Sequence, residues 1–371
     1  MTHAGAIGPG FTFGLSGLSA HADGTTPADY GRALRAVVDQ AVLAEELGLD
    51  AAWVCEHHFT DSGYLPAPFV ALAALGERTE RITLGTDVML ASMWDPVRFA
   101  EEAAVADQLS GGRLVLALGL GYRDVEFEGL GLHRRDRVAR LTECVRVLRQ
   151  AATGTVSGVG LLAEGEALPI SPLPAQDGGV PVWGGGKAEG AVRRARRIGD
   201  GYFASLMSPA GLERRIGWLH ETGPLDDRFA LAQTTLCFLA PTGASDIAAP
   251  GMSHLQAESR RWAREGGQEV ADTWRPGDPW QAATPREDLS EEEQLTHAVI
   301  VGDPDECIAR LTPYVETLAR APGAGPRHLS ARLTYPTISP EDNERSIRLF
   351  ATEVVPALRA VAAAAAPAPV A

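Results

Sequence analysis

Two adjacent histidines are the residues of this chain best suited to acid–base chemistry. His57 and His58 directly follow the apolar run 51–55. An imidazole changes its charge near neutral pH, so either ring can transfer a proton or bind a metal ion. Side chains of neighbouring strand residues point to opposite faces, so the two rings are poorly placed to share one ion. We therefore expect no metal and one proton-transferring histidine. The structural alternative, a packed and hydrogen-bonded ring, is stronger for His58 than for His57.

A run of glycines before a helical pattern is the second candidate site. The stretch Gly184-Gly185-Gly186-Lys187 separates the apolar run 180–183 from a predicted helix over 189–198. The free backbone N–H groups and the dipole at a helix N-terminus favour an anion, and glycines allow an anion to approach the backbone. The chain has no Walker sequence, so a single phosphate, such as that of FMN, fits better than a triphosphate. A purely structural tight turn is the alternative.

Two further features are weaker by themselves. Asp87 interrupts the apolar run 82–90, and a buried carboxylate needs a partner or a functional cavity. Gly119 and Gly121 follow the apolar run 113–118, but the stretch lacks the third glycine and the acidic residue of a dinucleotide-binding fingerprint. We interpret these two glycines as positions at which a flat ring could lie against the backbone.

The pattern of the whole chain indicates which elements must position these residues. Short apolar runs alternate with helical patterns from end to end, which is typical of a parallel sheet covered by helices. Predicted strands cover 11–18, 51–55, 82–90, 113–118, 180–183, 201–205, 229–239 and 327–335. Predicted helices cover 29–47, 68–76, 96–109, 134–150, 189–198, 209–220, 303–318 and 340–358.

Eight strands favour a single closed (β/α)8 TIM barrel over an open doubly wound sheet. The active sites of such barrels lie at the C-terminal ends of the strands, which is where the candidate residues occur. We treat residues 1–371 as one domain with its core at about 11–360. Insertions are expected after strand four (153–179, as a surface excursion or a hairpin) and after strand seven (241–297). The second insertion could be a lid or an oligomer surface, and the tail 361–371 is expected to fray.

The composition favours a protein that binds neither nucleic acid nor membranes. The 371 residues carry a formal net charge of −15, and such a surface repels phosphate backbones and anionic lipids. No stretch approaches about 18 apolar residues, and the N-terminus lacks the pattern of a secretory signal. The four cysteines form no CxxC pair, so we expect free thiols in a reducing cytoplasm.

Several stretches, taken together, resemble the bacterial-luciferase-like flavin monooxygenases over roughly residues 11–360. They are EHHFTDSGYLPAPFVALAAL, ITLGTDVML, DPVRFAEEAAVADQLSGGRL, GLGYRDVEF and the closing ISPEDNERSIRLFATEVVPAL. The resemblance implies a TIM barrel that binds reduced FMN and oxidises a small organic substrate with dioxygen. It implies a catalytic role for His57 near the reactive flavin carbon, and a non-prolyl cis peptide at Asp87–Val88. The other residues that it assigns to the cofactor site are His58, Gly119, Gly121, Tyr122, Gly185, Gly186, Lys187 and Ala188.

One departure from the family pattern concerns the flavin phosphate. Leu120 stands where bacterial luciferase has a phosphate-binding arginine, and Ala188 and Ala191 replace a serine and a threonine. Phosphate affinity must then come from backbone amides, Lys187 or an arginine elsewhere. This pattern suits an enzyme that receives reduced flavin from a separate reductase. It leaves room for a deazaflavin cofactor, although the doubled histidine favours FMN. A non-catalytic flavin-binding protein is the alternative outside the enzymes.

The helices over 68–76 and 96–109 are expected to form a homodimer. The first is apolar on nearly all sides, and the second carries small residues that permit close helix packing. An exposed apolar surface of this kind usually marks association, and the resemblance implies the same face.

Overall fold

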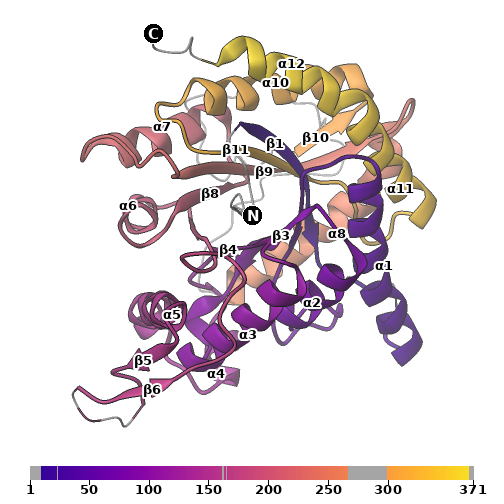
Figure 1. Cartoon of the computed structure of the whole chain (residues 1–371). Helices are drawn as coiled ribbons and strands as arrows, with labels where there is room; N and C mark the ends of the chain where they lie inside the picture. Colours follow the sequence, from indigo (N-terminus) through magenta and orange to yellow (C-terminus); the bar gives the residue numbers. More distant parts are fainter. Residues whose placement is uncertain (1–9, 23, 161–162, 164, 266–298, 367–371) are drawn as a thin grey trace.

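Eight parallel strands close into a barrel, as the sequence predicts. In the computed structural model, residues 10–22, 24–160, 163, 165–265 and 299–366 are described (Figure 1). Each strand pairs with its neighbour in parallel, and the last strand pairs with the first. The barrel strands are β1 (Phe11–Leu18), β2 (Ala51–Val54), β3 (Thr83–Met89), β4 (Leu114–Leu118), β7 (Val182–Gly185), β8 (Gly201–Ser205), β9 (Ala230–Leu239) and β11 (Arg327–Arg332).

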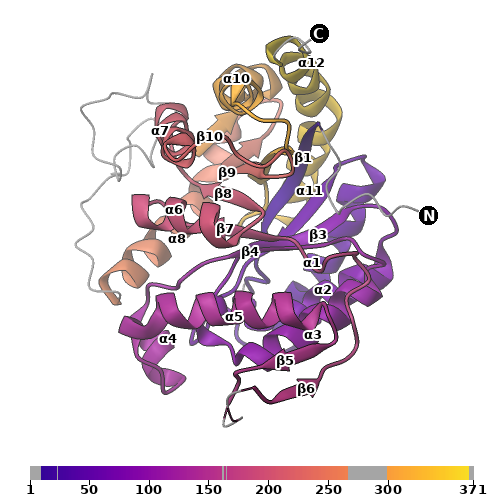
Figure 2. The ribbon, with the colours of Figure 1, turned by 60° about the vertical axis from the view of Figure 1, so that its left-hand side comes forward.

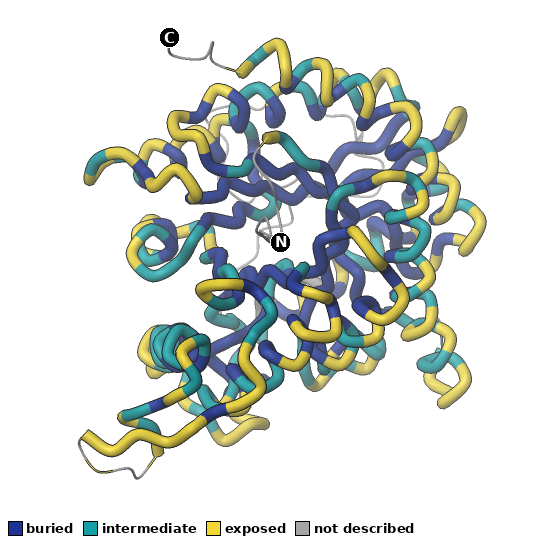
Figure 3. Tube along the Cα trace, viewed as in Figure 1, coloured by how far each residue is buried: buried dark blue, intermediate teal, exposed yellow. Residues whose placement is uncertain are grey.

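Helices surround the barrel and shield its strands, which are buried along nearly their whole length (Figure 3). The main helices are α1 (Pro27–Glu46), α2 (Pro68–Arg78), α3 (Pro96–Leu109), α5 (Arg137–Ala151), α6 (Glu189–Ile198), α7 (Pro209–His220), α10 (Pro304–Arg320), α11 (Pro340–Leu349) and α12 (Val355–Ala365). Helices α3 and α7 begin where the sequence predicts, because Asp95 and Ser208 cap their first turns and a proline follows each cap. A π-helical segment over Phe350–Val354 separates α11 from α12.

Both insertions contain regular structure in their described parts. The first contains the hairpin of β5 (Thr155–Ser157) and β6 (Ala167–Pro169), which pair antiparallel and project below the barrel in Figure 2. The second contains α8 (Ala244–Glu265), a helix that the sequence analysis does not predict within 241–297. The remainder of this insertion, from 266, lies outside the described residues.

A short strand missed by the sequence analysis follows the second insertion. β10 (Val299–Gly302) pairs in parallel with the last four residues of β9, beyond the part of β9 that pairs with β8 and β11. It therefore extends the sheet outside the barrel wall. At the C-terminus, α12 continues to Ala365, so the tail expected to fray from 361 is helical over its first residues.

An aromatic layer fills the centre of the barrel. Trp53 lies with its ring centroid 5.4 Å from that of Trp183 and 5.1 Å from that of Phe203. The Trp53 indole donates a hydrogen bond of 2.9 Å to Nε2 of His328, and burial lowers the pKa of His328 to about 3. The layer holds a neutral histidine and closes the barrel below its C-terminal mouth.

Two expectations concern surface and thiol chemistry. Among the helices of the described ranges, none combines the length and the apolar character that a membrane crossing requires.

All four cysteines are free, as expected, and all four are buried. Burial raises the pKa of Cys144 and of Cys237 to about 12, so these thiols stay protonated at neutral pH.

Candidate active site

The C-terminal ends of four strands bring most of the predicted site residues together. Val88, in β3, is the centre of this cluster: a Cβ placed on Gly119 would lie 2.6 Å from its Cγ2. A Cβ placed on Gly185 would lie 2.9 Å from its Cγ1. The Asp87–Val88 peptide bond is cis, as the resemblance implies. The ends of β3 and β7 and the residue after β4 therefore meet at one place on the barrel mouth.

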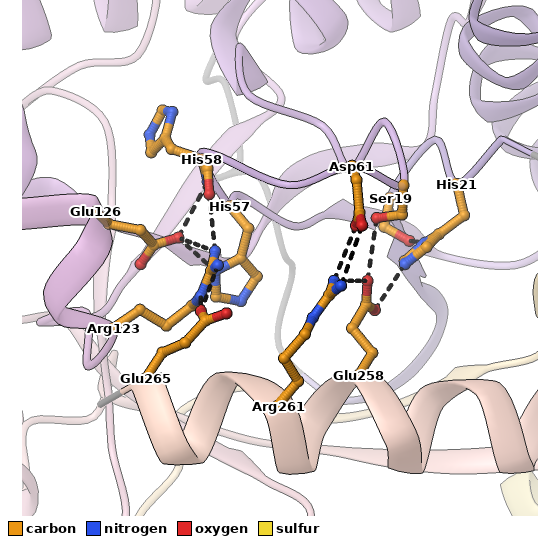
Figure 4. A network of polar contacts seen from close by, with 11 residues as sticks. Ser19, His21, His57, His58, Asp61, Arg123, Glu126, Glu258, Arg261 and Glu265 are labelled. Atoms are coloured by element: carbon orange, nitrogen blue, oxygen red, sulfur yellow. Dashed lines mark hydrogen bonds and ion pairs between the residues drawn. The ribbon is translucent and has the colours of Figure 1, made fainter. Parts of the chain in front are cut away.

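His57 stands at this mouth with one ring nitrogen fixed. Its Nδ1 lies 2.8 Å from Oε1 of Glu126, and its side chain is 12% exposed (Figure 4). Nε2 forms no hydrogen bond with any residue that the structure describes. A ring held at Nδ1 by a carboxylate presents Nε2 as the position that can exchange a proton with a ligand.

Glu126 is the partner that the sequence analysis did not assign, although it lies in the quoted stretch GLGYRDVEF. It belongs to the short helix α4 (Asp124–Gly129) and is completely buried. Its Oε1 accepts hydrogen bonds from His57 Nδ1, from the His58 backbone N–H (3.0 Å) and from Arg123 (3.2 Å). Burial would raise the pKa of Glu126, but the bond from His57 and the other donors outweigh burial and lower it. Glu126 is therefore ionised at neutral pH.

His58 is directed away from His57 and has a structural environment (Figure 4). Its Nε2 lies 3.0 Å from Oε1 of Glu56, which is itself buried. Glu56 also accepts hydrogen bonds from the Trp94 indole (3.0 Å) and the Leu90 backbone N–H (2.5 Å). Burial lowers the pKa of His58, but the hydrogen bond and charge of Glu56 outweigh burial and raise it. The sequence analysis assigned His58 to the cofactor site. In the structure its ring contacts Glu56 and points away from the ring of His57.

Helix α8 lies across the mouth and covers His57. The ring of Trp262 has its centroid 4.4 Å from that of His57, and the Arg123 guanidinium lies 4.8 Å from the Trp262 centroid. Arg123 also forms an ion pair of 2.6 Å with Glu265. The described part of the second insertion thus contacts the site. The question of lid or oligomer surface extends to 266–297, which lie outside the described residues.

An ion pair and a histidine–carboxylate hydrogen bond also fasten α8 to the loops of the barrel mouth (Figure 4). Arg261 lies 2.9 Å from Asp61 in the segment after β2, and Glu258 lies 2.9 Å from Nε2 of His21 in the segment after β1. Ser62 donates a further hydrogen bond of 3.0 Å to Glu258. Such contacts at successive turns hold one face of the helix against the barrel.

Two buried polar atoms near His57 lack partners among the described residues. They are Oε2 of Glu126 and the indole Nε1 of Trp262. Buried polar groups are nearly always hydrogen-bonded in native proteins, so an unpaired acceptor and an unpaired donor in contact with His57 or its partners are groups that a polar ligand could satisfy.

Asp87 is a titratable group at the same mouth. The thiol of Cys55 donates a hydrogen bond of 2.9 Å to its Oδ1. Burial raises the pKa of Asp87 to about 7, more than the nearby Arg332 and the Cys55 bond lower it. Half of these carboxyl groups are therefore protonated near neutral pH.

The two glycines after β4 are required by protein packing. Val88 occupies the space beside Gly119, and Gly121 has φ +71° with Met93 and Phe127 against it. Close approach of these side chains explains both glycines without a ring stacked on the backbone. Tyr122, between them and α4, has its ring centroid 5.8 Å from that of His57, so it belongs to the wall of the site.

The start of α6 fits the phosphate of a flavin. Ala188, its N-cap residue, provides no side-chain hydrogen bond to the helix, and space is open beside Gly190. Gly186 has φ +133°, and a Cβ there would lie 2.6 Å from that of Ala191. The loop backbone can therefore turn into the helix only with glycine, and the first N–H groups of α6 remain accessible to an anion.

Arginines near this loop supply the positive charge that Leu120 cannot. Arg215 of α7 is buried and donates a hydrogen bond of 2.9 Å to the Lys187 carbonyl. Arg194 of α6 lines a crevice with Gly184 and Gly185. Burial, and then the positive charges of Arg197 and Arg137, lower the pKa of Arg194, which places several cations together. An anion at this helix start would be attracted by these charges.

Comparisons with known proteins agree with this fold. A family model described as luciferase-like monooxygenase matches residues 12–321. An F420-dependent glucose-6-phosphate dehydrogenase of Nocardia farcinica (strain IFM 10152) is 28% identical over 337 residues, covering 88% of this chain and 95% of that protein. Monooxygenase RslO1 from Streptomyces bottropensis has a TM-score of 0.71 at 21% identity, covering 93% of this chain and 99% of that one.

A second solved structure contains a flavin. The oxygenating constituent of 3,6-diketocamphane monooxygenase from the CAM plasmid of Pseudomonas putida, in complex with FMN, has a TM-score of 0.67 at 18% identity. The match covers 93% of this chain and 98% of that one. Both cofactors that the sequence analysis considers, FMN and a deazaflavin, thus occur among the similar proteins.

The closed barrel and the His57–Glu126 pair define an enzyme of the TIM-barrel class, with its site at the C-terminal ends of the strands. The family match extends over most of that barrel. The chain therefore belongs to the luciferase-like monooxygenase family, whose members are oxidoreductases.

Proposed function

We propose that the chain is a flavin-dependent monooxygenase that uses reduced FMN and dioxygen to oxidise a small organic substrate. The observation that carries the proposal is His57, with Nδ1 held by a buried carboxylate and Nε2 left for a ligand. Reduced FMN, when bound, supplies the electrons that activate dioxygen. A separate reductase would deliver it, because Leu120 and Ala188 provide no side-chain grip on the phosphate. An intact His57–Glu126 pair argues against a non-catalytic flavin-binding protein.

The residues of the mouth have separate tasks in this proposal. His57 Nε2 holds or moves a proton at the reacting atoms, and Glu126 stabilises the protonated ring. The Trp262 ring and α8 exclude water from the space around His57, which protects reactive species from side reactions. The phosphate would bind at backbone N–H groups of Gly186 to Ala188, with Lys187 beside them. The acidic chain would act in the cytoplasm, apart from nucleic acids and membranes.

A deazaflavin-dependent oxidoreductase is the second candidate. The replaced phosphate-binding residues, Leu120, Ala188 and Ala191, favour it because the site lacks the side chains expected for tight FMN binding. The F420-dependent relatives are consistent with this candidate.

Anaerobic titration of the protein with reduced FMN and, separately, with the reduced deazaflavin distinguishes the two candidates. We expect saturable binding of reduced FMN, followed by substrate-dependent consumption of dioxygen on exposure to air. Binding of the deazaflavin alone would transfer the assignment to hydride-transfer chemistry. Binding of neither would contradict both proposals.

Replacing Lys187 by alanine is expected to weaken FMN binding by about 1 kcal/mol, because the change removes a charged donor next to the phosphate. Riboflavin, which lacks the phosphate, should bind the wild-type protein and the variant alike. Fluorescence titration with both flavins measures the difference. Equal weakening of the two flavins would show that Lys187 acts on the ring or on the fold, and the phosphate site would then lie elsewhere.

Homodimerisation through α2 and α3 is the expected assembly. Less apolar surface is exposed on α2 than the sequence suggests, because Phe69, Leu72 and Leu75 are buried within the chain. Val70 remains 70% exposed on α2, and Val105 and Leu109 are exposed on α3. Val70→Asp should therefore dissociate the dimer by placing a charge in the apolar contact.

Light scattering at micromolar concentration measures the expected assembly. The wild-type protein should have twice the mass of the 39.2 kDa chain, and Val70→Asp should approach one chain. Glu77→Gln, an exposed change at the far end of α2, is the control and should stay dimeric. A wild-type protein with the mass of one chain contradicts the prediction.

A further inference from the structure

Arg332 is a buried cation that forms no ion pair with any carboxylate of the described residues. It is the last residue of β11 and is 8% exposed. Its Nε donates to the Thr334 carbonyl (3.3 Å), and its Nη2 donates to the Ser19 hydroxyl (3.2 Å). Both acceptors are neutral. Burying a charged group is strongly unfavourable unless an opposite charge or a full set of hydrogen bonds compensates for lost water.

Two other buried arginines of this chain have partners that compensate for the loss of water around their charge. Arg123 forms ion pairs with Glu126 and Glu265. Arg327, at the opposite end of β11, donates hydrogen bonds to six backbone carbonyls. Arg332 has neither arrangement: besides its two hydrogen bonds, its guanidinium lies 5.5 Å from the ring centroid of Tyr335, a neutral partner that does not balance the charge.

A cavity of about 220 Å³ adjoins Arg332. It lies between the segment after β1, one face of α1 and the segment after β11. Its apolar wall includes Ala33, Ala36 and Val37 of α1. At its rim, the exposed Arg32 is already paired with Asp29. The volume is just below the roughly 300 Å³ at which ligand pockets begin, so a small molecule or one end of a larger one would fit.

A row of aromatic contacts runs from the cavity to His57. His21 lines the cavity, and its ring centroid lies 4.7 Å from that of Tyr64. Tyr64 in turn lies 5.0 Å from His57, centroid to centroid. A molecule held at Arg332 would therefore lie close to the barrel mouth, separated from His57 by the rings of His21 and Tyr64.

Asp87 is the carboxyl group whose pKa the positive charge of Arg332 lowers. It balances this charge only in part. Burial raises its pKa to about 7 although Arg332 lowers it. A substantial fraction of Asp87 is thus neutral at physiological pH, and its Oδ1 already accepts the Cys55 thiol. A bound anion beside Arg332 would complete the charge balance that Asp87 only partly supplies.

We propose that Arg332 binds the carboxylate of a small organic acid in this cavity. The buried guanidinium supplies the charge and directional donors, and the α1 wall receives the apolar body of the acid. The statement that this acid is the molecule oxidised rests on the function proposed above; the binding site itself does not.

Calorimetric titration of the full chain, without flavin, tests the site with benzoate as the probe. Benzamide is the matched control, since it has nearly the same shape and no charge. We expect benzoate to bind at one site and benzamide at least roughly tenfold more weakly. Arg332→Gln should weaken benzoate binding by at least about tenfold, and Arg332→Lys should recover part of the loss. Arg35→Gln, an exposed change on α1 outside the cavity lining, should bind benzoate like the wild type.

Each contrary result overturns the proposal. These are absent benzoate binding by the wild type, equal binding of benzamide, full benzoate binding by Arg332→Gln, and a loss through Arg35→Gln as large as through Arg332→Gln. Binding of inorganic phosphate in place of benzoate would also overturn the carboxylate assignment. Thermal denaturation checks that the variants fold, and if Arg332→Gln does not, the benzoate-to-benzamide ratio of Arg332→Lys decides. A failed flavin titration beside intact benzoate binding would remove the proposed function and leave this site standing.

Discussion

Replacement of His57 by alanine is expected to lower turnover by at least about tenfold, because a positioned proton-transfer group is lost. The ring is the one at the mouth whose Nδ1 is fixed and whose Nε2 is available to a ligand. Stopped-flow absorbance measures the rate at which protein-bound reduced FMN is oxidised by dioxygen, and oxygen consumption measures turnover. The fold should persist, since the ring is partly exposed and packs against Tyr64 and Trp262 at the surface of the mouth.

His58→Ala is the matched control for this experiment. The neighbouring ring is bound to Glu56, away from the ligand space, so its loss should affect the melting temperature more than the rate. If His57→Ala keeps full activity while His58→Ala loses it, the roles of the two histidines are reversed.

Glu126→Gln is expected to slow turnover at least roughly tenfold as well, because the change removes the charge that stabilises protonated His57. The two effects should not add: in a His57→Ala background, Glu126→Gln should cost little more, since Glu126 acts on the reaction through that ring. The measurements are the rates of the wild type, both single variants and the double variant.

Two controls separate this positioning role from a general loss of stability. Glu128→Gln lies in the same short helix, is exposed, and should leave the rate unchanged. Glu126→Asp keeps the charge and should recover part of the rate. Full additivity of the Glu126 and His57 effects would show that Glu126 acts on the fold or on another group, and the pair would lose its functional meaning.

The barrel was predictable from the sequence because its signals are local and repeated. Each buried parallel strand is a short apolar run, and helices such as α3 are marked by a cap and a proline at their starts. Helix α8 escaped prediction because Pro250 and many charges hide its periodicity. Strand β10 escaped because four residues after a charged segment are too few to establish a pattern.

The candidate site was predictable only where a single segment carries it. His57 and the glycine run could be found because residue type and position after a strand suffice. Glu126 and Arg332 could not be found, because their roles depend on burial and on partners from distant segments of the sequence. A glutamate in a short helix normally faces solvent, and only the fold shows that this one is buried against His57. The contact of Trp262 with His57 likewise depends on how α8 lies across the barrel.

The pairing of β10 with the end of β9 bears on how this enzyme could diversify. Helix α8 is attached at the mouth by its ion pairs, and β10 returns the chain to the barrel wall through four paired residues. The pairs of Val299–Gly302 with β9 fix the point at which the chain re-enters the sheet. The register of β11 is set by its own pairs with β9 and β1, so sequence changes between α8 and β10 need not disturb the barrel wall. The barrel and the segment between these two anchors can thus vary in sequence separately.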